Sequence, residues 1–237
     1  MLISGRGQTL KLIINNRDRL GTLQEMVAWG VAAGHEVIIV DQRSSYPPLL
    51  RWLGTFPCQL VRHENAGPWP DIRTGLAEFG KPGEVAAYTD SDLDLSQCPR
   101  DMLERFADLL DAHPEVRKVG CALRIDDLPD TPVANHAWKR EAEFWPGGFA
   151  QTIYEAKIAS TLAVYRVGER CRSTADLYGP ALRVAGNCTA RHRPWYYTEH
   201  DIPADERYYL RHLERRGPVF SRLLKKQIEK ASRKGKA

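Results

Sequence analysis

Apolar and polar positions alternate in blocks through the first half of the chain. Short apolar runs rich in β-branched residues predict strands, and apolar residues at helical spacing predict the helices between them. The predicted strands are residues 10–14, 37–40, 58–62, 84–88 and 116–125, and the predicted helices are about 23–31, 71–79 and 99–110. Strands that alternate with helices form a mostly parallel sheet with helices on both faces. The pattern therefore predicts an α/β fold.

The second half of the chain is less regular. Its predicted elements are an aromatic stretch at 138–149, strand-like runs at 158–166 and 182–185, and a charged helix at about 204–216. Because no linker rich in Gly, Ser or Pro separates the halves, we expect residues 1–221 to form one domain, with halves of about 1–130 and 131–221. Residues 222–237 hold seven Lys or Arg and one acid, which predicts a basic tail on a body of net charge −2.

The composition is that of an ordinary globular protein. The 237 residues are 43% apolar and 27% charged, which excludes a wholly disordered chain. The longest weakly apolar run, residues 26–34, is about half the roughly 20 residues that a membrane-spanning helix needs. The N-terminus lacks a secretion signal, and the five scattered cysteines form no C-x-x-C pair. We therefore expect a cytoplasmic protein with reduced, structural cysteines.

Polar side chains follow the predicted strands at the points where the strands end. In an open parallel sheet, ligands bind outside the carboxyl ends of the strands, so these side chains are expected to line one crevice. They are Asn15, Asn16, Arg17, Asp41, Asp90, Asp92, Asp126 and Asp127. The chain has no P-loop, dinucleotide fingerprint, nucleophile elbow or H-E-x-x-H pair, which disfavours the corresponding enzyme classes.

The triplet Asp90-Ser91-Asp92 offers two carboxylates directly after a predicted strand. Both can approach one divalent cation, and Mg²⁺ or Mn²⁺ held in this way completes its shell with substrate phosphates. The spacing alone is weak evidence, since Asp92-Leu93-Asp94 repeats it, and the position after the strand gives it weight. The alternative is a turn and N-cap cluster before the helix that begins near Pro99.

Taken together, five segments resemble nucleotide-sugar-dependent glycosyltransferases of the GT-A fold, in the broad group around family 2. The segments, which span most of the chain, are LKLIINNRDR, EVIIVDQRSS, HENAGPWPDIRTGL, AYTDSDLDL and RHRPWY. The resemblance implies a GT-A-like sheet with a Rossmann-like nucleotide-binding half and an acceptor half. It also implies a metal-dependent transfer of a sugar from a nucleoside-diphosphate sugar, with a UDP-sugar as the expected donor, to a hydroxyl acceptor.

The resemblance implies roles for individual residues. Those expected at the nucleotide sugar are Asn16, Arg17, Asp41, Asn65, Arg73 and Asp90, and those expected at the metal are Asp90, Asp92 and His192. The expected cofactor is Mn²⁺ or Mg²⁺, and the imidazole of His192 favours Mn²⁺. An ordinary core or surface histidine is the rival interpretation of His192. Trp195 is expected on the acceptor side because it lies three positions after His192.

The catalytic base is assigned to Asp126 and Asp127, which follow the fifth predicted strand. An inverting transfer needs a carboxylate to deprotonate the acceptor hydroxyl, whereas a retaining transfer need not show one. The Glu-Asp pair that is frequent in the family is not evident, and the possible substitutes are Glu141, Glu143, Glu199 and Asp201. In the alternative interpretation, Asp127 before Leu128-Pro129 simply forms a turn.

The acceptor cannot be read from the motifs. A polysaccharide or glycolipid, a small molecule and a hydroxylated base in DNA all fit. The basic tail predicts contact with DNA or an anionic membrane surface, and the alternative is a solvated tail that aids solubility. Two rivals come from other classes. A nucleotidyltransferase would need a glycine-rich loop after the first strand, which is absent, and a non-catalytic nucleic-acid-binding protein would leave the acids unused.

Overall fold

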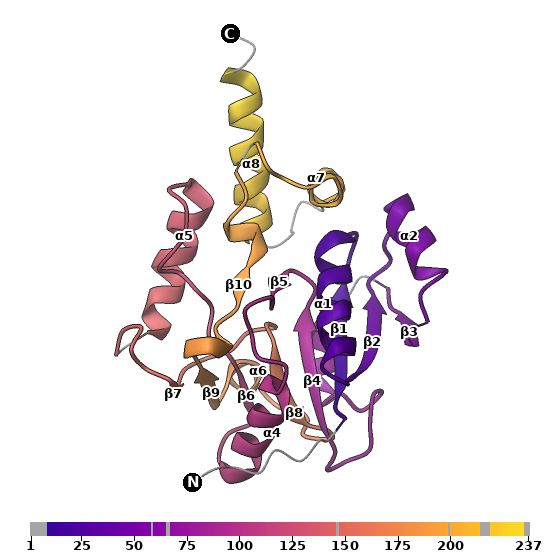
Figure 1. Cartoon of the computed structure of the whole chain (residues 1–237), viewed down its shortest axis with the longest axis vertical. Coiled ribbons are helices and arrows are strands. Elements are labelled where there is room, and N and C mark those ends of the chain that lie inside the picture. Colours follow the sequence, from indigo (N-terminus) through magenta and orange to yellow (C-terminus); the bar gives the residue numbers. More distant parts are fainter. Residues whose placement is uncertain are drawn as a thin grey trace.

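An eight-stranded sheet forms the centre of the computed structural model, which describes residues 9–57, 59–64, 67–145, 147–198, 200–213 and 219–234 (Figure 1). The strands are β1 (Lys11–Asn16), β2 (Glu36–Asp41), β3 (Gln59–Arg62), β4 (Val85–Asp90), β6 (Lys118–Cys121), β7 (Ile153–Glu155), β8 (Ala163–Arg166) and β9 (Ala181–Val184). Their order is β3-β2-β1-β4-β8-β6-β9-β7. Only β7 and β8 run against the other six. The sheet is therefore mostly parallel, as predicted.

Helices cover both faces of this sheet. They are α1 (Gly21–Ala32), α2 (Pro47–Leu53), α3 (Trp69–Arg73), α4 (Met102–Ala112), α5 (Pro132–Glu141), α6 (Thr174–Tyr178), α7 (Ala204–Arg211) and α8 (Val219–Lys234). Leu12 and Ile14 of β1 pack in the larger apolar cluster with α1 and α4, whereas Ile13 packs in a second cluster with α3 and α6. Alternate side chains of a strand point to opposite faces. The predicted α/β class with a two-sided sheet is thus confirmed.

Short elements complete the chain at the carboxyl edge of the sheet. Strands β5 (Leu93–Asp94) and β10 (Arg191–His192) pair as a separate two-stranded sheet, and 3₁₀ turns occupy Ala142–Phe144, Gly186–Cys188 and Arg193–Trp195. The four described cysteines are unpaired, and Cys58 lies outside the described residues. None of the helices in the described ranges is long and apolar enough to cross a membrane.

The helix predicted over 71–79 is shorter in the structure. Helix α3 ends at Arg73, and Gly75 and Leu76 follow with left-handed φ values of 67° and 55°. The backbone of Glu169 lies 2.7 Å from where a Cβ on Gly75 would stand, so only glycine fits this turn. The turn therefore docks on the loop that follows β8 instead of continuing the helix.

Two predicted strands are also shorter in the structure than in the sequence-based prediction. The run 116–125 contributes only β6, and Leu123 then makes an isolated bridge to Ala190, which draws the chain out of the main sheet. The run 158–166 contributes only β8, because residues 159–161 leave the sheet to line a cavity. In both cases the apolar run is longer than the segment that pairs with its neighbours in the main sheet.

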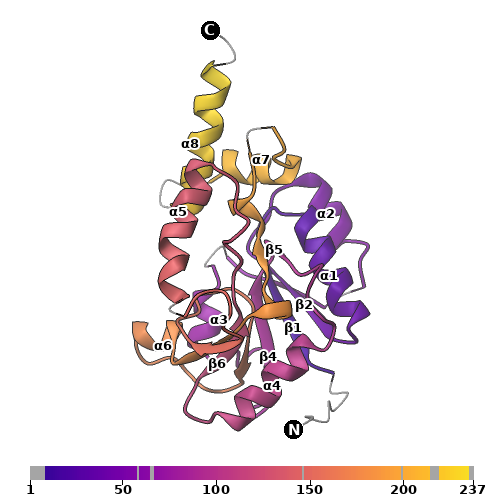
Figure 2. The same cartoon turned by 60° about the vertical axis from the view of Figure 1, so that its left-hand side comes forward.

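The C-terminal basic segment is helical and begins against the body of the protein. Leu224 is fully buried, and Phe220 and Ile228 pack on the main apolar cluster. Helix α8 lies beside α5 and then projects away from the sheet, so that the C-terminus is at the far end of the molecule (Figures 1 and 2). The division drawn at residue 221 from charge alone thus falls inside a helix.

A buried histidine between α1 and β2 predicts a pH dependence of stability. The imidazole of His35 is fully buried, lies 3.8 Å from Glu104, and has a pKa lowered by burial. Since the unfolded chain binds this proton more readily than the folded protein, folding loses free energy as the pH falls below the ordinary histidine pKa.

We expect His35→Gln to lose less unfolding free energy than the wild type between about pH 7.5 and about pH 5.5, as measured by denaturant titration. The control is His113→Gln, which removes an exposed histidine. Equal pH dependence in the wild type and His35→Gln would contradict the assignment.

Candidate functional site

A cavity of about 900 Å³ opens at the carboxyl ends of β1 and β4. Asn15 comes from the end of β1, Gln42 follows β2, and Asp90 ends β4. The opposite wall comes from the second half of the chain, and its lining residues include Arg140 of α5, Trp195, Tyr209 of α7, and Phe220 and Ser221 of α8. The cavity thus lies between the two halves of the chain, at the edge where a parallel sheet binds ligands.

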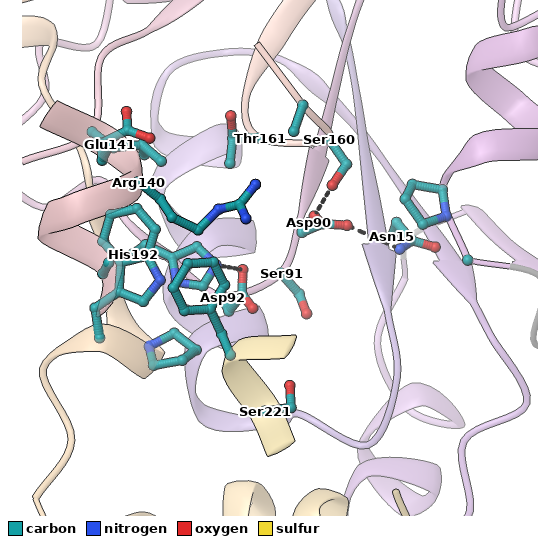
Figure 3. A pocket seen from close by; sticks show the side chains of 18 of the residues that line it. Asn15, Asp90, Ser91, Asp92, Arg140, Glu141, Ser160, Thr161, His192 and Ser221 are labelled. Carbon is teal, nitrogen blue, oxygen red and sulfur yellow. Dashed lines mark hydrogen bonds and ion pairs between the residues drawn. The ribbon is translucent and has the colours of Figure 1, made fainter. Parts of the chain in front are cut away.

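Asp90 is held by both of its carboxylate oxygens. Asn15 faces it across the parallel β1–β4 pair and donates from Nδ2 to Oδ1 at 3.1 Å. Ser160, brought alongside by the antiparallel β4–β8 pair, donates from Oγ to Oδ2 at 2.5 Å. Gln42 in turn donates from Nε2 to Asn15 Oδ1 at 2.8 Å. Sheet register therefore fixes the orientation of this carboxylate (Figure 3).

Asp92 and His192 meet because their flanking residues pair. Leu93 of β5 lies opposite His192 of β10, and the Arg193 N–H donates to the Asp92 carbonyl at 2.9 Å. As a result, His192 Nε2 lies 3.4 Å from Asp92 Oδ1, and the imidazole stacks near the Trp195 ring with 4.6 Å between centroids. Residues a hundred positions apart thus share one wall of the cavity (Figure 3).

Arg19 approaches Asp92 from the other side. Its guanidinium lies 3.5 Å from Asp92 Oδ2 and 2.7 Å from Glu206 of α7, and it covers the Tyr209 ring. The neighbouring Asp205 accepts from the N–H groups of residues 20 and 21 and caps α1. Helix α7 therefore fixes Arg19 in place at the cavity wall.

The two aspartates differ in the direction in which their pKa values are shifted. Burial, together with the negative charge of Asp92, raises the pKa of Asp90 to about 7. Burial also acts to raise the pKa of Asp92, but the charges of His192 and Arg19 outweigh it and hold that pKa below its usual value. Burial lowers the pKa of His192. Asp92 and His192 therefore act on each other, since the charge of Asp92 in turn acts to raise the pKa of His192.

The residues at this edge fit a divalent cation. Asp92 Oδ1 and His192 Nδ1 are both buried without a hydrogen-bond partner, although buried polar atoms are nearly always paired. Carboxylate oxygen and imidazole nitrogen are suitable ligands for Mn²⁺ and, in the case of the carboxylates, for Mg²⁺. Asp90, Asp92 and His192 are therefore the candidate ligands in this cavity, whereas the group of described residues that brings three ligand atoms within 4.8 Å of one another is His63, Asp71 and Glu78.

Three other potential ligands gather away from the cavity. His63 lies 3.6 Å from Asp71 and 3.2 Å from Glu78, and Tyr88 donates to Asp71 at 2.8 Å. Each ring nitrogen of His63 faces a different carboxylate. A histidine bridging two acids accounts for this group without an ion.

The structure brings together only some of the residues that the sequence predicts at the nucleotide sugar, the metal and the acceptor. Arg17, Asp90, Asp92, His192 and Trp195 line the cavity. Of the rest, Asn16 is buried and accepts from Ser91 Oγ at 2.6 Å, Asp41 is buried and accepts from the Ser44 N–H, and Arg73 is exposed and does not line the cavity. Asn65 lies outside the described residues.

The residues expected as the base lie outside the cavity. Asp127 accepts from Arg191 Nε at 2.8 Å and from the Tyr196 hydroxyl at 2.7 Å, and Asp126 is exposed beside Arg124. Strand β6 ends at Cys121, so both acids follow the strand at a distance. Of the possible substitutes, Glu141 and Glu143 line the cavity, Asp201 does not, and Glu199 lies outside the described residues.

Several cavity residues were not foreseen. They are Arg19, Gln42, Arg140, Ser160, Thr161, Arg183 and Ser221. The sequence could have indicated Gln42, because it directly follows Asp41 at the end of β2. Neighbouring side chains of a strand point to opposite faces of the sheet, so Gln42 and Asp41 face different sides. Ser160 has none, since only the antiparallel pairing of β8 with β4 brings it to Asp90.

Comparison with known proteins gives partial similarity to solved structures only. No family model and no curated protein matches the chain. Among solved structures, GalNAc-T7 with UDP, GalNAc and Mn²⁺ is similar with a TM-score of 0.45 and 14% sequence identity, over 85% of this chain and 48% of that one. The chain thus spans about half the length of this neighbour. A similarity at this level assigns no function.

Proposed function

We propose that the protein is a metal-dependent glycosyltransferase that moves a sugar from a nucleoside-diphosphate sugar, with a UDP-sugar as the first candidate, to a hydroxyl acceptor. The observation that carries the proposal is the meeting of Asp90, Asp92 and His192 in one cavity at the carboxyl edge of the sheet. The mostly parallel sheet is consistent with a GT-A-like fold. A volume of about 900 Å³ also suits a ligand of nucleotide-sugar size.

The cavity offers groups for each part of such a transfer. When bound, a divalent cation would neutralise the charge that develops on the departing diphosphate. Asn15 and Ser160 hold Asp90 in a fixed orientation, so that no reorganisation is needed during the reaction. On the other wall, the rings of Trp195 and Phe220 pack 5.5 Å apart and offer an apolar surface for a sugar ring of the acceptor.

A calorimetric screen of UDP, GDP, CDP and dTDP, each with Mn²⁺ or with EDTA, tests the proposal directly. We expect one diphosphate to bind with Mn²⁺ and to lose its affinity in EDTA, because the ion links the carboxylates to the phosphates. Binding of none of the four to the folded protein would refute the donor site.

The two sets of carboxylates predict different effects on turnover. Glu143 lines the cavity, whereas Asp127 lies outside it and is bound by Arg191. If the base lies in the cavity, Glu143→Gln lowers kcat by about a hundredfold or more with little change in diphosphate affinity, since general-base catalysis contributes 10²–10⁴-fold. Asp127→Asn is the comparison, and a larger loss of kcat there would restore the assignment made from the sequence.

The class of acceptor can be tested by changing the charge of helix α8. We propose a polysaccharide, glycolipid or small-molecule acceptor, with a hydroxylated base in DNA as the alternative. Deleting residues 222–237 would remove the buried Leu224 and disturb the fold, so charge substitutions are the better test. Lys226→Glu with Lys230→Glu changes two exposed residues of α8. A selective loss of duplex binding favours DNA, and a selective loss of binding to anionic vesicles favours a membrane-linked acceptor.

A further inference from the structure

We propose that the first turn of helix α8 binds a phosphate-like oxyanion of a substrate, a proposal that rests on the proposed function and deepens it. The helix begins at Val219, and its residues Phe220 and Ser221 line the cavity. Figure 3 shows Ser221 at the edge of the site, across from Ser91 and Asp92. The beginning of the basic helix is therefore part of the cavity wall.

Ser221 is a buried donor that lacks an acceptor. The residue is 5% exposed, and no described residue hydrogen-bonds to its hydroxyl. The hydroxyl is not among the fully buried unpaired atoms of the described residues, so it remains accessible from the cavity that Ser221 lines. Since this hydroxyl points into the cavity, a ligand is the partner that its position suits (Figure 3).

The helix itself adds positive potential at the same place. The first N–H groups of a helix have no partner within it, and the aligned peptide dipoles favour an anion at this end. Helix α8 is 16 residues long, and Arg222 and Lys225 follow directly in its first two turns. An oxyanion beside Ser221 would accept from the hydroxyl and from backbone N–H groups at once.

A second donor without an acceptor lies next to this turn. The indole Nε1 of Trp195 is buried and unpaired, Trp195 lines the same cavity, and its ring packs against Phe220. The carboxylates of Asp90 and Asp92 share the cavity with basic side chains, among them Arg19 and Arg140. A phosphate that enters together with a divalent cation meets both the acids and these donors.

Two sources could supply this oxyanion: the diphosphate of the donor and a phosphate carried by the acceptor. The test is calorimetry with Mn²⁺-pyrophosphate, Mn²⁺-UDP, uridine and inorganic phosphate on wild type, Ser221→Ala and Ser221→Asp. We expect Ser221→Asp to weaken pyrophosphate binding at least about tenfold, and Ser221→Ala less, with uridine unaffected. An acid in the first turn favours the helix, so a loss of binding reports on the ligand. Lys230→Gln, which changes the charge by the same single unit on an exposed turn, is the control.

The outcomes separate the sources. If the donor is the source, Ser221→Asp weakens UDP as strongly as pyrophosphate, and phosphate does not bind to protein saturated with Mn²⁺-UDP. If the acceptor is the source, phosphate binds to the saturated wild type and not to saturated Ser221→Asp. The proposal is overturned if the wild type binds neither pyrophosphate nor phosphate, or if the Ser221 variants bind both within twofold of wild type. Pyrophosphate binding that depends on Ser221, without binding of any nucleoside diphosphate, would refute the proposed function and leave the oxyanion site standing.

Discussion

Replacing Asp92 with asparagine is expected to abolish Mn²⁺-dependent binding of the nucleoside diphosphate and to lower transfer by about a thousandfold or more. Asp92 has a buried oxygen without a hydrogen-bond partner beside His192, and the charges of His192 and Arg19 lower the pKa of its carboxyl group. A bound cation contributes several kcal/mol to the stabilisation of developing charge, and each 1.36 kcal/mol is a factor of about ten in rate. The amide removes the charge that holds the ion while nearly preserving the shape of the side chain.

The chain carries its own matched control for this substitution. Asp94 repeats the spacing of the triplet, but it accepts from the Ser96 N–H at 3.0 Å, lies 3.4 Å from Arg193, and does not line the cavity. We expect Asp94→Asn to retain metal-dependent binding and transfer. Isothermal titration with Mn²⁺ and EDTA measures both variants. Metal dependence that survives in Asp92→Asn, or that is lost equally in Asp94→Asn, would place the ion elsewhere.

The sequence predicts the cavity wall at the ends of β1 and β4 better than the opposite wall, because the two walls are built differently. Asp90 follows a strand that a β-branched and apolar run defines, and parallel pairing necessarily brings its end beside that of β1. The meeting of Asp92 with His192 depends on two strands of two residues each. Such short strands carry no periodic signal, so only the resemblance to a family indicated His192.

Asp126 and Asp127 show how one misjudged strand boundary changes the expected position of a residue. The apolar run 116–125 indicates a long strand, and Asp126 and Asp127 would then stand at its carboxyl end. In the structure, hydrogen bonding to the sheet ends at Cys121, and the bridge from Leu123 to Ala190 redirects the chain. An apolar pattern indicates which side chains are buried. In this run, side chains remain buried after pairing with the main sheet has ended at Cys121. Two other acids that line the cavity, Glu141 and Glu143, come from a region with no strand pattern.

A lysine buried in the sheet predicts the second large effect. Lys118 of β6 is 1% exposed, and its ammonium group donates to the carbonyl groups of Ile158 and Leu177 at 2.7 Å and of Ala159 at 3.3 Å. An ammonium group has three protons, so the three acceptors use all of them. Ser160, the next residue in this loop, donates to Asp90, and its carbonyl accepts from the Asp90 N–H. Lys118 therefore supports the loop that orients the Asp90 carboxylate.

We expect Lys118→Met, which keeps the length of the side chain and removes the donors, to lower the free energy of unfolding by about 3 kcal/mol or more. Each buried group left unpaired costs about 1–3 kcal/mol, and three carbonyl groups lose their donor. Denaturant unfolding measures the loss, with Lys81→Met at an exposed position as the control, expected within about 0.5 kcal/mol of wild type. Under conditions where the variant is still folded, metal-dependent diphosphate binding should weaken as well, because the loop no longer fixes Ser160 against Asp90. A variant as stable as wild type would show that water or backbone rearrangement satisfies the three carbonyl groups, and that the loop holds its position without the lysine.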